Sequence, residues 1–193
     1  LKGDSSAHVA CEVLATAGKV LVAGEISAKV MPDIPSIVCR TIRETGYTGL
    51  DYEIEVITHD QSDDIAHAVR EGVQTGAGDQ GIMYGYATNE TAEQMPIPYM
   101  VATKFLQLLK NHPSKMFRAD AKAQVSYDYD TGRITTFLCS VQHSPDVEVS
   151  DFRHIIESMM VLAACEYGLD GDFTKLVNPT GRFVLGGSYA DCG

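Results

Sequence analysis

Three glycines within six residues surround one carboxylate and one amide near the middle of the 193-residue chain. The stretch is GAGDQG, residues 76–81, and an apolar run, IMYGYA, follows directly. Glycine loses more backbone entropy on folding than any other residue, so a cluster of glycines indicates a tight turn or a close approach to a ligand. Taken alone, a surface loop is the commoner interpretation of such a hexapeptide, and a ligand-binding turn is the alternative.

A second group of polar side chains lies in the stretch RADAK, residues 118–122. Side chains alternate between faces in a strand, so Arg118, Asp120 and Lys122 share one face if this segment is extended. That face is either a polar ligand site or a surface ladder of ion pairs. Further candidates at strand ends and glycine turns are Glu12, Gln61, Asp79, Gln80, Arg182 and Asp191.

Glu25 and Phe183 are two other candidates, each with an ordinary alternative. Glu25 interrupts the apolar run VLVAGEI, where a buried carboxylate is costly unless it meets a cation or a bound ammonium group. A solvated carboxylate at a strand end is the usual alternative. Phe183, inside TGRFVLGG, is either a core residue or a platform on which a base stacks.

Common catalytic and nucleotide motifs are missing from the sequence. The six histidines show no spacing of four residues and no flanking cysteine pair, so we interpret them as surface or core residues rather than zinc ligands. The chain contains neither a G-x-S-x-G elbow nor a G-x-x-x-x-G-K-[ST] loop. These two absences argue against a serine hydrolase of the G-x-S-x-G type and against a P-loop nucleotide fold.

The composition is that of an ordinary globular protein with 45% hydrophobic residues. A net charge of -11 argues against a nucleic-acid surface and against an anionic membrane surface, both of which require clustered Lys and Arg. An anionic small ligand would need a local basic cluster or a divalent cation. The five cysteines form no C-x-x-C pair, which indicates a reducing, cytoplasmic location.

The periodicity of apolar residues predicts alternating strands and amphipathic helices. Strands are expected over 19–30, with a polar break at Gly24-Glu25, over 52–58 and over 82–87. A helix capped by Asp33 should end before Gly46, and a second should span about 97–111.

The second half of the chain shows the same kind of pattern. A hairpin is expected around Thr131-Gly132, then a helix capped by Ser150, and finally two short strands separated by a Pro/Gly turn. The polar stretch 59–75 is expected to be a mobile loop. We therefore predict an α+β protein built from two similar units, each a mixed sheet with helices packed on one face.

The order of several sequence blocks resembles that of S-adenosylmethionine synthetases (methionine adenosyltransferases). GAGDQGIMYGYATNETAEQMP is similar to the signature region of that family, and VACE, VLVAGEI, RETGY, DAKAQV, SVQHS and NPTGRFVLGG follow the family's order. The resemblance covers essentially the whole chain. It implies the synthetase fold, with residues 1–70 as the remainder of an N-terminal domain ending in a gating loop and 76–193 as the central domain.

The resemblance also implies a reaction. Members of the family join L-methionine to ATP by attack of the thioether sulfur on ribose C5′, and they release phosphate and pyrophosphate. A thioether has a free lone pair at neutral pH, so its attack needs no general base. The enzyme's task is then to position the two substrates and to stabilise the charge of the leaving triphosphate. The family uses Mg²⁺ and K⁺ and places its active site at the interface of a homodimer or a higher homo-oligomer.

Residue by residue, the resemblance implies two catalytic positions, Lys122 and Asp120, which lie against the ribose and the phosphates. Methionine is expected at Glu25, Gln61 and Asp79, and the potassium site at Glu12. ATP-binding residues are expected at Asp79, Asp120, Lys122, Arg182, Phe183 and Asp191, with Phe183 stacking on adenine.

Several positions depart from the family pattern. Asp63 replaces a proline of the gating loop, Ala119 replaces another proline, and Ser188-Tyr189-Ala190 replaces the usual Pro-x-Gly turn. The family's Ser-Glu-Gly-His-Pro-Asp-Lys segment and its third repeat are not matched, so we expect a partial chain with doubtful activity by itself. The alternative function is a truncated, non-catalytic homologue that binds ATP or methionine, or that serves a full-length subunit as a regulatory or scaffold partner.

Overall fold

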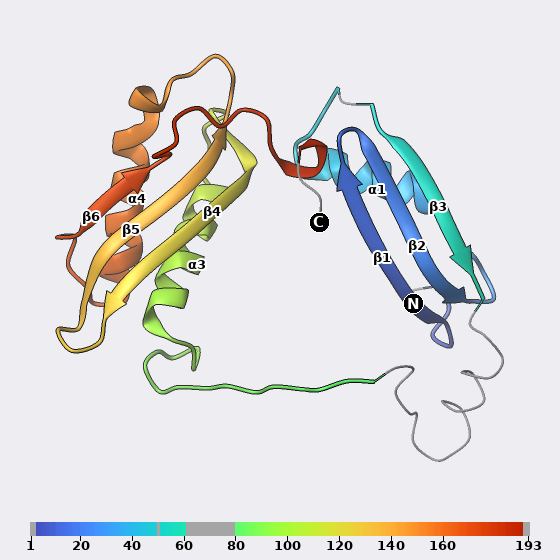
Figure 1. Ribbon diagram of the computed structural model, residues 1–193, viewed down its shortest axis with the longest axis horizontal. Coiled ribbons are helices and arrows are strands. Elements are labelled where there is room, and N and C mark those ends of the chain that lie inside the picture. Colours follow the sequence, from blue (N-terminus) through green and yellow to red (C-terminus); the bar gives the residue numbers. More distant parts are fainter. Residues whose placement is uncertain (1–2, 50, 61–79, 191–193) are drawn as a thin grey trace. The chain divides into compact units, whose positions relative to one another are not determined.

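A computed structural model of the chain describes residues 3–49, 51–60 and 80–190 (Figure 1). The chain divides into two compact units, one made of Leu1–Gly85 with Ser188–Gly193 and the other of Tyr86–Gly187. Each unit contains a three-stranded mixed sheet with helix on one face. The expected α+β class, with two similar units, is therefore confirmed.

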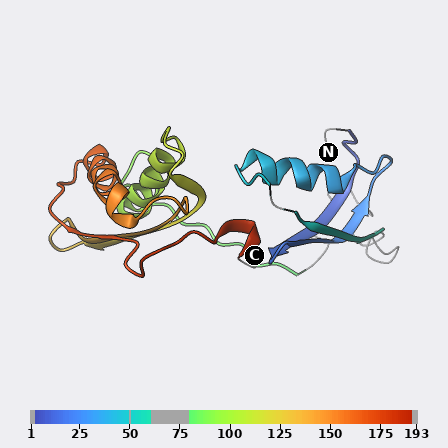
Figure 2. The same ribbon diagram turned by 90° about the horizontal axis from the view of Figure 1, so that it is seen from above.

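The sheet of the first unit has the order β1-β2-β3, from β1 (His8–Thr16), β2 (Lys19–Ser27) and β3 (Glu53–His59). Strand β1 runs antiparallel to β2, and β2 runs parallel to β3. Helix α1 (Ile34–Glu44) supplies the crossover that two parallel neighbours require. Figure 2 shows α1 on one face of this sheet.

Local sequence explains the first hairpin and its close packing. Ala17 and Gly18 form the turn between β1 and β2 with φ of 45° and 78°, as a right-twisted two-residue hairpin requires. Gly24 has no room for a side chain, because a Cβ would lie 2.1 Å from the carbonyl oxygen of Ala10. The strand expected over 19–30 thus forms with its polar pair Gly24-Glu25 inside it, paired with β1, but it ends at Ser27.

Helix α1 begins as the sequence predicts. The Asp33 side chain accepts a hydrogen bond from the backbone N–H of Ser36 at 3.1 Å, and a proline occupies the first turn. The helix ends at Glu44, before Gly46 with φ of 95°. Ile34, Val38 and Ile42 are half-buried, which identifies the face that packs on the sheet.

The second unit repeats this order of hairpin, helix and parallel strand. It comprises α3 (Ile97–Lys110), β4 (Phe117–Asp128), β5 (Arg133–His143), α4 (Val149–Glu166) and β6 (Thr174–Val177). Strand β4 pairs antiparallel with β5, and β5 pairs parallel with β6. Helices α3 and α4 lie together on one face of the sheet (Figure 2).

The core of the second unit lies between those two helices and the sheet. The helix expected over about 97–111 forms as α3, and its apolar stripe supplies Val101, Phe105 and Leu109, all buried. Phe105 meets Phe137 of β5 edge to face at 5.2 Å between ring centroids. The other fully buried large side chains of this unit are Val141, Cys139, His143, Phe152, Ile156, Met160 and Val177.

Glu90 organises the segment that leads into α3. Its carboxylate accepts hydrogen bonds from the Thr88 hydroxyl at 2.9 Å and from the Tyr129 hydroxyl at 3.1 Å. It also accepts from the first free backbone N–H of the helix, that of Ile97, at 3.1 Å, and this bond in particular lowers the pKa of Glu90.

No helix in the described ranges is long and apolar enough to cross a bilayer.

Three local expectations are wrong. Residues 82–87 form no strand and are exposed, with Tyr84 at 90%, because no strand within the described ranges pairs with them. Residues 182–186 likewise form no strand, since side chains of other elements take up their backbone groups. Helix α4 begins at Val149 rather than after Ser150, because Glu148 and Asp151 form a capping box.

Candidate functional site

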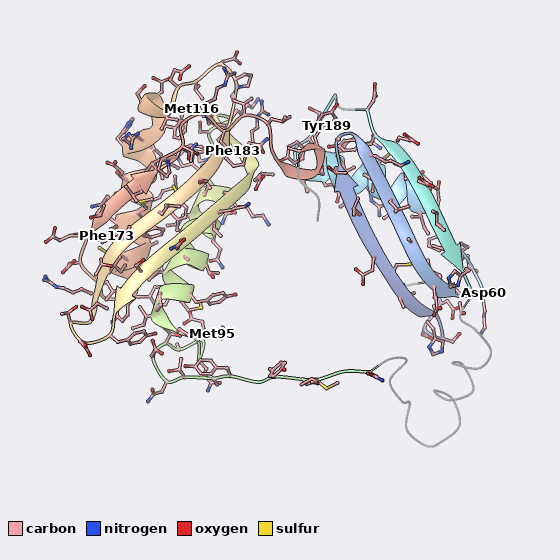
Figure 3. The ribbon with its side chains drawn as sticks, in the orientation of Figure 1. Asp60, Met95, Met116, Phe173, Phe183 and Tyr189 are labelled. Atoms are coloured by element: carbon pink, nitrogen blue, oxygen red, sulfur yellow. The ribbon has the colours of Figure 1, made fainter. Side chains whose placement is uncertain are left out.

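The segment that follows β6, residues 178–187, crosses the ends of β4 and β5 and brings several of the predicted ligand residues together. Three consecutive residues of β5, Val141, Gln142 and His143, hold it by hydrogen bonds. Figure 3 shows Phe183 in this segment, near the start of β4 and the end of β5. These hydrogen bonds hold the segment in place, although residues 178–186 form no helix or strand of their own.

Asn178 begins this segment and ties it to the sheet. Its side chain is 3% exposed, accepts from the backbone N–H of Val141 at 2.8 Å and donates to the carbonyl oxygen of the same residue at 2.9 Å. Its own N–H donates to the carbonyl of Cys139 at 2.9 Å. Asn178 has φ of 44°, a conformation that asparagine tolerates better than most residues. The amide therefore continues the β5–β6 pairing while the chain turns away.

Gln142 and His143 hold the next part of the segment. The Gln142 amide, 4% exposed, donates to the Val184 carbonyl at 2.9 Å and accepts a long hydrogen bond, 3.4 Å, from the backbone N–H of Asp120. His143 binds the backbone of Phe183 through its main-chain N–H at 2.9 Å and its ring at 3.1 Å. Buried polar groups that are paired in this way fix one conformation.

Asp120 and Phe183, which lie far apart in sequence, meet at Gly186. The Asp120 carboxylate accepts a hydrogen bond from the Gly187 N–H at 2.8 Å. A Cβ on Gly186 would lie 2.6 Å from Cε2 of Phe183 and 2.9 Å from Oδ2 of Asp120, so any other residue there would have to displace the ring or the carboxylate. The ring and the carboxylate thus flank one glycine, and both are only partly buried.

Lys122 and Arg182 are exposed cations close in sequence to this pair. Lys122 pairs with Ser140 in the β4–β5 ladder, whereas the adjacent Ala121 pairs with buried Val141. Side chains alternate along a strand, so Lys122 points to the face opposite α3 and α4. Neither Lys122 nor Arg182 forms an ion pair with another described residue, which leaves both charges available to an anion.

Glu25 and Glu12 lie in the first unit on one face of its sheet. Glu25 is opposite Ala10, and Glu12 is opposite Ala23, which places both carboxylates on the face away from buried Val20, Val22 and Ile26. Glu25 is half-buried and makes no ion pair with any residue described here, while Glu12 is exposed. A half-buried carboxylate without a cationic partner suits a bound ammonium group.

Three predicted ligands, Gln61, Asp79 and Asp191, lie outside the described residues, as does the expected mobile loop apart from His59 and Asp60. In the ranges that are described, no three His, Cys, Asp or Glu side chains are close enough to hold a metal ion. These described residues therefore do not by themselves make a Mg²⁺ site.

The buried thiol on β5 is not a candidate nucleophile. Cys139 is fully buried between the sheet and its helices, and this burial raises its pKa to about 12. Only the thiolate is reactive, so this cysteine is inert at neutral pH.

What the site offers is a half-exposed aromatic ring, a carboxylate and free cations on a rigid platform, which suits binding and orientation rather than covalent catalysis.

Four residues that support the site, Asn178, Gln142, His143 and Gly186, are not predicted by the sequence pattern. Gln142 and His143 bind backbone groups of Val184 and Phe183, and Asn178 binds those of Val141. Gly186 acts through its lack of a side chain, and a residue type alone reveals none of these partners. The blocks SVQHS and NPTGRFVLGG contain all four, so the collinear order of these two blocks was the available signal.

Comparison with known proteins shows which family the sequence resembles. The sequence matches the family description "S-adenosylmethionine synthetase, central domain" over residues 74–183 and "S-adenosylmethionine synthetase, N-terminal domain" over residues 1–74. It is 42% identical, over 219 aligned positions, to the S-adenosylmethionine synthase of Desulforudis audaxviator, covering all of this chain and 55% of that protein.

A solved structure gives the same result. An unusual S-adenosylmethionine synthetase from Campylobacter jejuni superposes with a TM-score of 0.80 at 26% identity, over the whole of this chain and 54% of the other. The chain thus spans about half the length of these two relatives. On the family matches, which together extend from residue 1 to residue 183, the chain belongs to the S-adenosylmethionine synthetase family.

Proposed function

We propose that this chain is part of a methionine adenosyltransferase, which forms S-adenosylmethionine from ATP and L-methionine. In this reaction a lone pair of the methionine sulfur forms the bond to ribose C5′, and the C5′–oxygen bond breaks. The electron pair of that bond leaves with triphosphate, which water then cleaves to phosphate and pyrophosphate. The observation that carries the proposal is the meeting of Phe183, Asp120 and Gly186 on a platform beside Lys122.

The nucleotide would bind in the second unit. A half-exposed phenylalanine offers adenine a stacking surface, and stacking of this kind is worth about 1–3 kcal/mol per base. One oxygen of Asp120 holds Gly187, which leaves the other available to a ribose hydroxyl. Lys122 and Arg182 are exposed cations without a described acidic partner, so they suit the negative charge of the phosphates.

Methionine would bind through the first unit. The half-buried carboxylate of Glu25 would take the ammonium group, and Gln61 and Asp79 would complete the methionine site. Because the thioether needs no proton removed, the role of these residues is to hold the sulfur in line with C5′. Residues 1–70 and 76–193 are proposed as the parts of the N-terminal and central domains, with residues 62–75 as the gating loop.

Mg²⁺ and K⁺ are proposed cofactors, with Glu12 at the potassium site. When bound, such ions neutralise phosphate charge. The described residues provide no metal site of their own, so further ligands would have to come from elsewhere in the enzyme. A homodimer or higher homo-oligomer with its active site at the interface, in the cytoplasm, completes the proposal.

Two measurements test this function. Isothermal titration should show ATP binding to the chain, and incubation with ATP, methionine, Mg²⁺ and K⁺ should yield S-adenosylmethionine detectable by mass spectrometry. Lys122→Ala should lower ATP affinity about tenfold, because it removes a charge-assisted contact. Lys110→Ala, which removes an exposed cation at the end of α3, is the matched control and should bind as the unmodified chain does.

The outcomes separate the enzyme from its alternative. Binding of ATP with no product from the chain alone, but with product once the complete protein is assayed, supports the enzyme. Binding with no product from the complete protein supports the non-catalytic homologue. No ATP binding to either form contradicts the enzyme and the ATP-binding homologue, and leaves only a homologue that binds methionine or serves as a regulatory or scaffold partner.

A further inference from the structure

His143 is a buried, titratable residue that the proposed chemistry does not use. It ends β5, is 1% exposed, and its ring packs against Phe152 with centroids 5.2 Å apart. Core histidines of this kind are often merely structural. Its hydrogen bonds indicate a more specific role.

Both ring nitrogens of His143 have defined partners. The backbone N–H of Phe183 points at Nε2 at 3.1 Å, and a backbone amide can only donate, so Nε2 must be the acceptor. Nδ1 lies 2.9 Å from the carbonyl oxygen of Ser144, which can only accept, so Nδ1 must carry the hydrogen. Only the neutral ring protonated on Nδ1 satisfies both contacts.

The same residue also holds the other side of Phe183. The backbone N–H of His143 donates to the Phe183 carbonyl at 2.9 Å, so both backbone groups of Phe183 are bound by one residue. Phe183 lies in no strand, which means that these two bonds replace the ladder that would otherwise fix it. The bond to the Phe183 carbonyl comes from the main chain of His143 and survives a substitution. The bond from the Phe183 N–H goes to the imidazole ring, so a substitution can remove it.

We propose that His143 is a positioning residue for the nucleotide. Its Nε2 fixes the main chain of Phe183 and thereby sets the aromatic ring against Gly186 and Asp120, where adenine would stack. This inference rests on the proposed function, because it takes Phe183 as the surface that binds the base. A purely structural His143 would affect the stability of the second unit without affecting nucleotide affinity.

Two substitutions separate these roles. Glutamine can place its amide oxygen where Nε2 lies and still accept from Phe183, whereas asparagine reaches only as far as Nδ1. Both lose the packing of the ring on Phe152, so both destabilise the fold. We expect His143→Gln to keep ATP affinity within about threefold of the unmodified chain and His143→Asn to lose about tenfold, which corresponds to one buried hydrogen bond.

Titration calorimetry with ATP, at a temperature where both variants are folded by circular dichroism, measures this difference. Equal affinities for His143→Gln and His143→Asn, with the unmodified chain binding ATP, would overturn the inference and leave the proposed function intact. Absence of binding by the unmodified chain would overturn the proposed function and the inference with it.

The ring can also be observed without nucleotide. Nitrogen-15 NMR of the imidazole should show a protonated Nδ1 and an unprotonated Nε2, and the Phe183 amide should exchange slowly with solvent. In His143→Asn that amide should exchange faster, and in His143→Gln it should stay protected. A ring protonated on Nε2, or a Phe183 amide equally protected in both variants, would overturn the inference.

Discussion

Substitution of Gly186 by alanine tests the geometry of the nucleotide platform. The added Cβ would lie 2.6 Å from Cε2 of Phe183 and 2.9 Å from Oδ2 of Asp120. Nonbonded heavy atoms prefer about 3.5–4.0 Å, so the ring edge has to move by about 1 Å. Asp120 is less free to move, because its oxygen is bonded to the Gly187 N–H at 2.8 Å.

The size of the effect follows from these contacts. Forcing an extra methyl group into a packed site typically costs about 1–3 kcal/mol. Alanine recovers about 0.4–1 kcal/mol by restricting the unfolded chain, since φ of Gly186 lies outside the left-handed region. We expect a net loss of about 1–2 kcal/mol in the free energy of unfolding. ATP affinity should fall about tenfold, because part of the stacking on Phe183 is lost.

Urea unfolding and calorimetric ATP titration of Gly186→Ala measure the two effects. Gly3→Ala is the matched control, since a Cβ there meets nothing within 4 Å. It should leave ATP affinity unchanged and should raise the unfolding free energy by about 0.4–1 kcal/mol at most, through the unfolded chain alone. Unchanged unfolding free energy and unchanged ATP affinity in Gly186→Ala would refute the placement of the ring and the carboxylate on either side of this glycine.

Three further predictions concern the supports of the platform and its core. Asn178→Ala should lower the unfolding free energy by about 2–4 kcal/mol in urea, because it leaves the backbone groups of Val141 unpaired; a loss as small as that of a surface substitution would contradict the two bonds. The pKa of Glu90 is lowered from 4.5, so its stabilising effect is present above pH 4.5 and is lost as pH falls through the lower folded pKa. Glu90→Gln should therefore lower the melting temperature well above pH 4.5 and make little difference well below it, and a pH-independent difference would be inconsistent with this role. Iodoacetamide should label exposed Cys165 in the native protein and Cys139 only after unfolding, as peptide mass spectrometry can show; native labelling of Cys139 would contradict its burial.

Most elements of the fold could be predicted from local patterns because their apolar faces repeat. Helices α1 and α3 and the β4–β5 hairpin each show a regular apolar period. Specific end signals, the Asp33 cap and the turn at Thr131-Gly132, add to that period in α1 and in the hairpin. Strand β1 was not predicted, although its partner β2 was. Its signal is weaker because three of its apolar side chains, Val9, Val13 and Leu14, remain exposed and do not give a clean alternation.

The errors arise where pairing decides the structure. Residues 82–87 are as rich in apolar and aromatic side chains as a true strand, but in the described part of the chain no strand lies beside them. Residues 182–186 also have a strand-like composition, and Gln142 and His143 take up backbone groups that a strand would need. Local composition cannot report such partners, which come from distant residues.

The candidate site was predicted in part. Asp120 and Phe183 do meet, and Lys122 lies on the open face of β4. The residues that hold them, Asn178 and His143 above all, carry no signal of their role in the sequence, because they act on main-chain groups. The family resemblance includes the two sequence blocks that contain these residues. The hydrogen bonds that they form are seen only in the structure.

A crystal structure of the complete protein with methionine and a non-hydrolysable ATP analogue tests the central claim most directly. The account predicts adenine stacked on the ring of Phe183, a ribose oxygen beside Asp120, and the phosphates toward Lys122. A nucleotide bound on a surface that includes neither Phe183 nor Asp120 would contradict it.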